Sequence, residues 1–150
     1  MKIFDWLDEF VGAEGSQLGP TDWLEIQQDR VDLFADATGD HQWIHVDPER
    51  AADGPFGVTI AHGLLTLSLL PYFMHQLYTV DNVAMAINYG FNKVRFITPV
   101  PVGKRLRARA RITDVIKLDS ALQATLVTTI EVEASSKPAA VIESIVRYVG

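Results

Sequence analysis

An almost wholly apolar stretch at residues 61–78 is the feature that most constrains how this chain can fold. It contains few β-branched residues after Thr66, which favours a helix. A helix that is apolar nearly all round is a buried one, so other elements have to cover it. Pro71 is expected to kink this helix or to restart it, because proline has no amide hydrogen to donate.

The segments after this helix are rich in Val, Ile, Thr and Tyr, and they predict strands with short connections. Helices first and strands afterwards predict an α+β arrangement, in which an antiparallel sheet packs on the apolar helix. The hotdog fold, a curved sheet wrapped around one central helix, fits this order. The expected strands are residues 83–91, 93–98, 105–116, 122–134 and 139–149.

Shorter elements are expected before the central helix. Residues 28–38 place apolar side chains on one helical stripe, and Gly39 follows where a helix commonly ends. Asp47 and Pro48 are typical of the start of a second short helix. The other expected elements are a short amphipathic helix within residues 1–11 and a short strand at residues 23–26.

The composition bounds the class of protein. The 150 residues suit one domain that spans residues 1–150. The absence of cysteine excludes disulfides, iron–sulfur ligation and thiol catalysis, and a net charge of −6 argues against general affinity for nucleic acid. Acidic residues near the N-terminus are not typical of a secretory signal, and no apolar run is long enough to cross a membrane. We therefore expect a cytoplasmic protein that contacts neither membrane nor nucleic acid.

The densest cluster of polar functional groups lies at residues 38–48, between two expected helices. Asp40 and His45 would point apart on a continuous helix, at roughly 140° around its axis. Gly39 ends the helix first, so a turning loop can bring the two side chains together. A carboxylate beside an imidazole can act as an acid–base pair, because histidine changes its charge near neutral pH.

Other interpretations of this cluster stay open. Asp40 can be a turn residue, and His45 a loop residue packed at the entry to a helix. His41 and His45 have the spacing of a zinc-binding pair, but the glutamate of a HExxH motif is missing, so we expect no metal site. The chain contains no Gly-x-Ser-x-Gly elbow and no glycine-rich phosphate loop.

Two more features are candidates for binding. Gly63 is expected at the amino end of the central helix, where its backbone N–H is free for a substrate carbonyl, although tight helix packing explains a glycine equally well. His62 beside it can be a binding, capping or core residue. Residues 93–111 hold seven of the thirteen Lys and Arg and no acid. Their arginines alternate with apolar residues, which favours a solvated outer strand face, while a polyanionic ligand such as the phosphates of coenzyme A is the functional alternative.

These motifs resemble the MaoC-like dehydratases, and among them the (R)-specific enoyl-CoA hydratases. The family signature of Gly-Asp, a few residues and then His stands here as Gly39-Asp40 and His45, with Ala51 at the place of a small residue. His62-Gly63 matches the family's entry to the central helix, and the likeness spans residues 31–115 with the order of motifs preserved.

This chain departs from the family pattern at two places. Gln42-Trp43 stands where relatives often have Asn-Pro, so we expect a changed loop shape with the Asp–His pair kept. Some relatives use a serine farther along the central helix, and that place falls at or near Pro71. We therefore assign no such role to Thr66 or Ser68.

The resemblance implies one MaoC-like hotdog domain that acts as a hydro-lyase in fatty-acid metabolism. The reaction would be the reversible syn addition of water to a trans-2-enoyl-CoA, which gives a (3R)-3-hydroxyacyl-CoA. Asp40 and His45 would activate the water that attacks C3 and supply the proton at C2, while the Gly63 N–H polarises the thioester carbonyl. His62 and Arg95 are further substrate-binding candidates, Arg95 for a phosphate of coenzyme A. The family needs no metal or redox cofactor, since coenzyme A is part of the substrate, and its members pair as homodimers.

Two rival functions remain at this point. A hotdog acyl-CoA thioesterase shares the fold and the coenzyme A site but hydrolyses the thioester. A non-catalytic acyl-thioester-binding subunit of a heteromeric dehydratase would keep the fold without the reaction.

Overall fold

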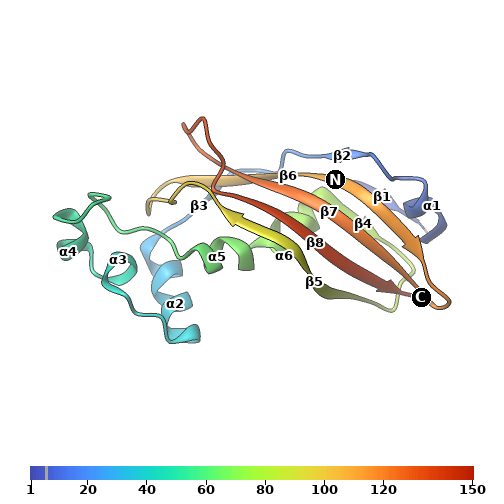
Figure 1. The fold of residues 1–150 in the computed structure, drawn as a ribbon, viewed down its shortest axis with the longest axis horizontal. Coiled ribbons are helices and arrows are strands. Elements are labelled where there is room, and N and C mark those ends of the chain that lie inside the picture. Colours follow the sequence, from blue (N-terminus) through green and yellow to red (C-terminus); the bar gives the residue numbers. More distant parts are fainter. Residues whose placement is uncertain (6) are drawn as a thin grey trace.

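A curved sheet is the largest part of the structure, a computed structural model that describes residues 1–5 and 7–150. Its six strands are β2 (Gln17–Leu18), β3 (Leu24–Glu25), β5 (Met85–Phe96), β6 (Arg105–Lys117), β7 (Ala121–Val132) and β8 (Ala140–Val149). They follow the order β2-β6-β7-β8-β5, with β3 also on β6, and every pairing between them is antiparallel. Figure 1 shows the helices of the central segment along one face of this sheet. The predicted α+β arrangement is confirmed.

Side chains alternate between the core and the outer face along the long strands. On β6, Leu106, Ala108 and Ile112 are buried, because successive residues of a strand point to opposite faces. The arginines between them lie on the outer face, as the sequence predicts. They are Arg105, Arg107, Arg109 and Arg111.

Strand β5 corrects one sequence prediction. We expected two strands, at residues 83–91 and 93–98, and the structure forms a single one. Its register against β8 shifts between Asn88 and Gly90 and again between Phe91 and Lys93. Bulges of this kind let a strand bend without ending, which explains why the polar residues near position 92 do not separate two strands.

The apolar central segment forms two consecutive helices, α5 (Gly63–Ser68) and α6 (Leu70–Leu77). Pro71 lies in the first turn of α6, where a missing amide hydrogen costs no helical hydrogen bond, so the predicted restart is confirmed. Leu65 and Phe73 are buried against Ile130 and Ile142 of the sheet. Burial of this part of the segment under the sheet accounts for much of its apolar composition, but Leu64 and Tyr72 are exposed, so the segment is not buried all round as its sequence predicts.

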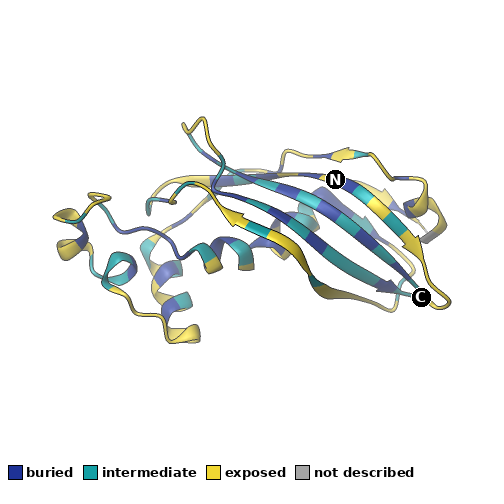
Figure 2. Cartoon of the chain, viewed as in Figure 1, coloured by how far each residue is buried: buried dark blue, intermediate teal, exposed yellow. Residues whose placement is uncertain are grey.

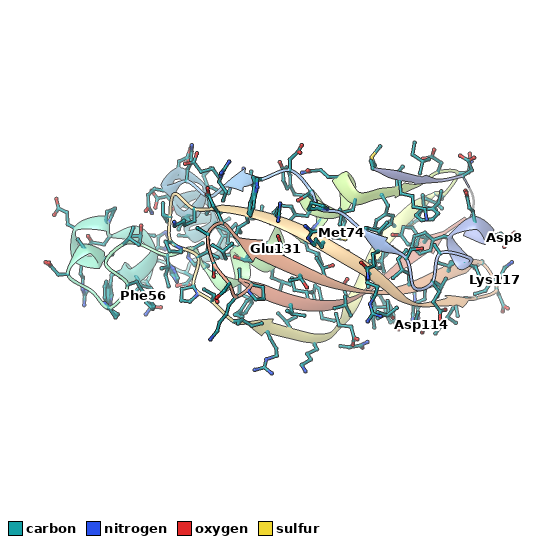
Figure 3. The ribbon with its side chains drawn as sticks, turned by 90° about the horizontal axis from the view of Figure 1, so that it is seen from above. Asp8, Phe56, Met74, Asp114, Lys117 and Glu131 are labelled. Carbon is teal, nitrogen blue, oxygen red and sulfur yellow. The ribbon has the colours of Figure 1, made fainter. Side chains whose placement is uncertain are left out.

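The N-terminal region also differs from the prediction of one amphipathic helix within residues 1–11. Residues Lys2–Phe4 form strand β1, which pairs in parallel with β4 (Tyr78–Val80), and the helix α1 is limited to Leu7–Val11. Phe4 and Phe10 pack edge to face, with ring centroids 4.8 Å apart, in a second core that also buries Tyr78. Lys117 Nζ lies 2.6 Å from Asp8 Oδ1 and ties α1 to the end of β6 (Figure 3).

Three short helices lie together beyond the opposite end of the sheet (Figure 1). They are α2 (Gln28–Thr38), α3 (Trp43–Val46) and α4 (Pro48–Ala52). Gly39 ends α2 in the left-handed conformation, with φ at 81°, and Asp47 caps α4 by accepting a hydrogen bond from the Arg50 N–H at 3.1 Å. Both helix boundaries match the sequence prediction. None of the helices among the described residues has the length and hydropathy needed to cross a membrane.

Candidate active site

Asp40 and His45 converge in the structure. Gly39 reverses the chain at the end of α2, Asp40 follows in the turn, and His45 lies on the short helix α3. One ligand atom from each of Asp40, His45 and His62 falls within 4.8 Å of the others. The turn after Gly39 thus brings together the two side chains that a continuous helix would have separated. Their catalytic roles remain predictions.

His45 is held by a backbone carbonyl. The residue is 7% exposed, and its Nδ1 lies 2.7 Å from the carbonyl oxygen of Ile60. A carbonyl oxygen can only accept a hydrogen bond, so Nδ1 carries the proton and donates. In the neutral ring, Nε2 then keeps its lone pair, which is the state that a general base requires.

The carboxylate of Asp40 is the solvent-facing member of the pair. Its side chain is 51% exposed, and Oδ2 lies 4.0 Å from Nε2 of His62. The Gln42 N–H donates to Oδ1 over 3.4 Å, a long contact within the same turn. Most of the capacity of this carboxylate to accept hydrogen bonds is therefore available to a water molecule or a substrate.

His62 lies behind the pair, buried to 2% exposure. Its Nε2 donates to the backbone carbonyl of Asp40 at 2.9 Å, and its ring stacks on His45 with centroids 3.9 Å apart. Phe34 packs on it with a centroid distance of 4.9 Å. The structure therefore surrounds this predicted substrate-binding residue with protein groups.

A cavity of about 340 Å³ opens beside His45. Gly63, the first residue of α5, lines it, and the backbone N–H at that position has no acceptor within its own helix. A Cβ built on Gly63 would lie 3.1 Å from the ring of Phe96, so only a glycine fits under this ring without a shift. The lining residues are His45, Ile60, Ala61, Gly63, Thr66, Phe96, Ile97, Thr98, Pro99, Val100 and Ala139.

Most of these lining residues were not candidates in the sequence analysis, and Phe96 and Thr66 are two of them. Phe96 reaches Gly63 from strand β5, and no local sequence pattern predicts a contact between segments so far apart in the chain. Thr66 lies one helical turn beyond Gly63 and is buried, and that spacing of three could have placed it on the cavity side. Ser68, by contrast, donates to the Leu64 carbonyl at 2.7 Å and is exposed.

The structure does not bring Arg95 to this cavity. Arg95 lines a separate hollow on the outer face of the sheet, together with Lys93 and Glu143, whereas its neighbour Val94 packs against the core. Alternation along the strand places the two on opposite faces. Contact between Arg95 and coenzyme A phosphate therefore stays a prediction.

His41 pairs with Asp36 and does not belong to the cluster of Asp40, His45 and His62. Its Nε2 lies 2.8 Å from Asp36 Oδ1, and this hydrogen bond raises the pKa of His41. The zinc pair of His41 and His45 is thus not assembled. In the set of Asp40, His45 and His62, the carboxylate and Nε2 of His45 are uncommitted, whereas Nε2 of His62, the ring nitrogen 4.0 Å from the carboxylate, already donates to a carbonyl.

Fold and site together define an α+β hotdog protein with a carboxylate–imidazole pair at the amino end of its central helix. A family model described as "MaoC like domain" matches residues 9–135. The 3-hydroxyacyl-thioester dehydratase Z of Mycobacterium tuberculosis is 60% identical over 150 residues, which cover 99% of both chains. The chain therefore belongs to the MaoC-like dehydratase family and is a dehydratase enzyme, as predicted.

Solved structures agree with the hotdog fold. The (R)-hydratase from A. caviae involved in PHA biosynthesis has a TM-score of 0.72 and 27% identity, over 89% of this chain and 94% of that one. The C-terminally truncated 3R-hydroxyacyl-ACP dehydratase complex HadBC from Mycobacterium tuberculosis contains a chain with a TM-score of 0.64 and 18% identity, over 89% of this chain and 96% of that chain. The latter likeness concerns the fold alone.

Proposed function

We propose that this dehydratase catalyses the reversible syn hydration of trans-2-enoyl-CoA to (3R)-3-hydroxyacyl-CoA. The observation that carries the proposal is the convergence of the Asp40 carboxylate and the His45 imidazole beside a cavity that Gly63 also lines. The name of the 3-hydroxyacyl-thioester dehydratase from Mycobacterium tuberculosis supports an acyl-thioester substrate, and that of the (R)-hydratase supports a hydration with (R) stereochemistry.

The proposed addition needs a water molecule and two acid–base groups on one side of the double bond. Asp40 and Nε2 of His45 hold the water, whose oxygen attacks C3 while its proton passes to the pair. A proton from the pair then reaches C2 on the same face, so one water is consumed and no other reactant is needed. The return of the proton from the same side gives syn stereochemistry.

Gly63 has a separate task in this proposal. Attack at C3 moves negative charge onto the thioester oxygen, and a backbone N–H at the start of α5 can donate to that oxygen. The missing side chain lets the carbonyl approach the backbone, where any Cβ would meet Phe96. The proposal requires no metal or redox cofactor.

Crotonyl-CoA distinguishes this reaction from thioester hydrolysis. We expect the absorbance of the conjugated enoyl thioester to disappear without release of free thiol, and chiral analysis to give the (3R) product. Thiol release with the double bond retained would favour the thioesterase. Absence of both, with bound acyl-CoA, would favour a non-catalytic subunit.

Substitutions test the two acid–base groups. Asp40→Asn and His45→Gln should each lower kcat by at least about 10²-fold, the usual contribution of a positioned acid or base. His41→Gln is the matched control, because His41 lies in the same turn but contacts Asp36. Hydration at the wild-type rate by both variants would place the active site elsewhere.

We also propose that two copies of the chain pair along the free edge of β5. One edge of this strand bonds to β8, and no strand among the described residues covers the other. Figure 2 shows β5 exposed over most of its length, and Met85, Ile87 and Phe91 are apolar residues in this row. Such an edge is a template for pairing, and a second copy offers the same edge for a symmetric, antiparallel contact. A different MaoC-like subunit is the alternative partner, since HadBC is by its name a complex.

A further inference from the structure

We propose that His62 is a positioning residue, which fixes the place of Asp40 and the ring orientation of His45 without touching the substrate. This inference rests on the hydration proposed above and adds a residue that the reaction depends on indirectly. It is carried by three features of one buried ring: a hydrogen bond, a stack and an unpartnered nitrogen.

The hydrogen bond of His62 secures the turn that carries Asp40. Within the described residues, the N–H at Nε2 makes the one hydrogen bond that ties Asp40 to a distant part of the chain. The other contact of Asp40, from the Gln42 N–H, lies within the turn itself. An exposed carboxylate on a short turn needs such a tie to stay beside His45, because loops are otherwise mobile.

The stack secures His45. The two imidazole planes lie 23° apart, so His62 covers one face of the His45 ring. The carbonyl of Ile60 meanwhile holds the edge of that ring at Nδ1, and the Ile60 N–H donates to the Ile44 carbonyl at 3.0 Å. Residues 60–62 thus restrain His45 along its edge and across its face.

The same segment continues directly into Gly63. A run of four residues therefore carries the carbonyl that sets the His45 tautomer, the ring that orients it and the N–H proposed for the thioester oxygen. Since the catalytic groups of the proposed reaction must keep their relative positions to within about an ångström, one rigid segment that links them has a direct effect on rate.

The two stacked rings hold opposite tautomers. Both bond to carbonyl oxygens, which accept only, so His45 carries its proton on Nδ1 and His62 carries its proton on Nε2. Nδ1 of His62 is the one buried side-chain nitrogen or oxygen without a partner among residues 1–5 and 7–150. A proton at that nitrogen would be a buried donor with no acceptor, which is unfavourable, so this nitrogen keeps its lone pair.

A purely structural role is the alternative, in which His62 fills space between Phe34 and His45. Three substitutions separate the roles. His62→Gln keeps an amide N–H for the Asp40 carbonyl but removes the ring, His62→Phe keeps an aromatic ring but removes the donor, and His62→Leu removes both. His41→Gln is the control for loss of a histidine in the same region.

We expect His62→Leu to lower kcat for crotonyl-CoA hydration by about 10²-fold, and the Gln and Phe variants to recover part of that loss, roughly tenfold each. KM should stay within about threefold of the wild type, because the ring does not line the cavity. The His41 control should keep wild-type kcat. Wild-type kcat in the Leu variant would overturn the proposal. So would equal kcat in all three variants, with each loss of kcat matched by a loss of thermal stability (Tm).

Nitrogen NMR of histidine-labelled protein tests the arrangement without any activity. Nδ1 of His45 and Nε2 of His62 should bear protons, and the other nitrogen of each ring should not. In His62→Phe the Asp40 turn should give changed amide shifts. A proton on Nδ1 of His62 in the wild type would contradict the proposal even if hydration is observed. An unchanged tautomer pair in a protein that releases thiol would contradict the proposed function instead.

Discussion

The ring of Phe96 lies over Gly63, so close that a Cβ on Gly63 would stand 3.1 Å from ring atoms Cγ and Cδ2 and 3.2 Å from Cε2. Phe96 belongs to β5 and Gly63 to α5, and both line the cavity beside His45. A methyl group at position 63 would thus occupy the space proposed for the thioester carbonyl and push the ring outward.

Gly63→Ala should therefore lower kcat/KM for crotonyl-CoA by at least about tenfold while the protein stays folded, because a lost contact to a developing oxyanion costs 10²–10³-fold in the best-known cases. Phe96 is half exposed and can move, and alanine favours a helix over glycine by roughly 0.5–1 kcal/mol, so Tm should not fall. Steady-state kinetics and thermal unfolding measure both effects.

Gly12→Ala is the matched control, since a Cβ there would meet its nearest neighbour, the Glu9 carbonyl oxygen, at an ordinary van der Waals distance of 3.6 Å. Equal kinetics for the wild type and Gly63→Ala would show that the carbonyl does not bind at this backbone position.

The ion pairs of Glu131 should make the free energy of unfolding depend on pH in the acidic range. Burial raises the pKa of this carboxyl, but hydrogen bonds from Arg107 and Arg109 outweigh it, so the pKa lies below the ordinary 4.5. A lowered pKa in the folded state stabilises the fold above the unfolded pKa, and this contribution is lost as pH falls through the folded pKa. Glu131→Gln should cost roughly 0.5 kcal/mol near neutral pH, since the pair is partly exposed, and progressively less below about pH 4.5. Urea unfolding at several pH values measures the difference.

The control for this pH dependence is Glu49→Gln, on the exposed helix α4. Its difference from the wild type should stay small across the same range. A difference for Glu131→Gln that grows on acidification would contradict the sign derived from the two arginines.

Phe73 tests the role of the central segment in the core. The Phe73 side chain on α6 is fully buried, whereas the neighbouring Tyr72 is 44% exposed. Phe73→Ala should lower the free energy of unfolding by about 3–5 kcal/mol, the usual cost of removing a large buried side chain. Tyr72→Ala should cost far less in the same urea titration. Similar losses for both would mean that α6 does not pack on the sheet as described.

Structure is predicted most accurately from the sequence where a single residue determines the local backbone conformation. Gly39 and Pro71 each mark a helix boundary through their own backbone chemistry, and both boundaries are found. The convergence of Asp40 and His45 follows from the first of them. By contrast, Lys2–Phe4 becomes a strand because its partner lies at Tyr78–Val80, far away in the sequence.

In the candidate site, too, the contacts that depend on distant segments could not be predicted from the local sequence. Burial of His62 depends on Phe34 and His45, and Phe96 reaches Gly63 from another strand, so neither contact leaves a pattern in the local sequence. The outer position of Arg95 could have been inferred, because a strand that points Val94 into the core must turn its neighbour outward.

The exposed edge of β5 gives a test of the proposed homodimer. Phe91 is 46% exposed on this strand, and burial of such a side chain against a second copy would stabilise a dimer through apolar contact. Phe91→Glu places like charges at a symmetric contact, so light scattering after gel filtration should find a monomer where the wild type is a dimer. Phe56→Glu is the matched control, because Phe56 is 45% exposed in the loop after α4, at the far end of the molecule from Asp8 (Figure 3). A dimer that survives Phe91→Glu but not Phe56→Glu would move the interface to the helical end of the fold, and a wild-type monomer would contradict the proposed pairing altogether.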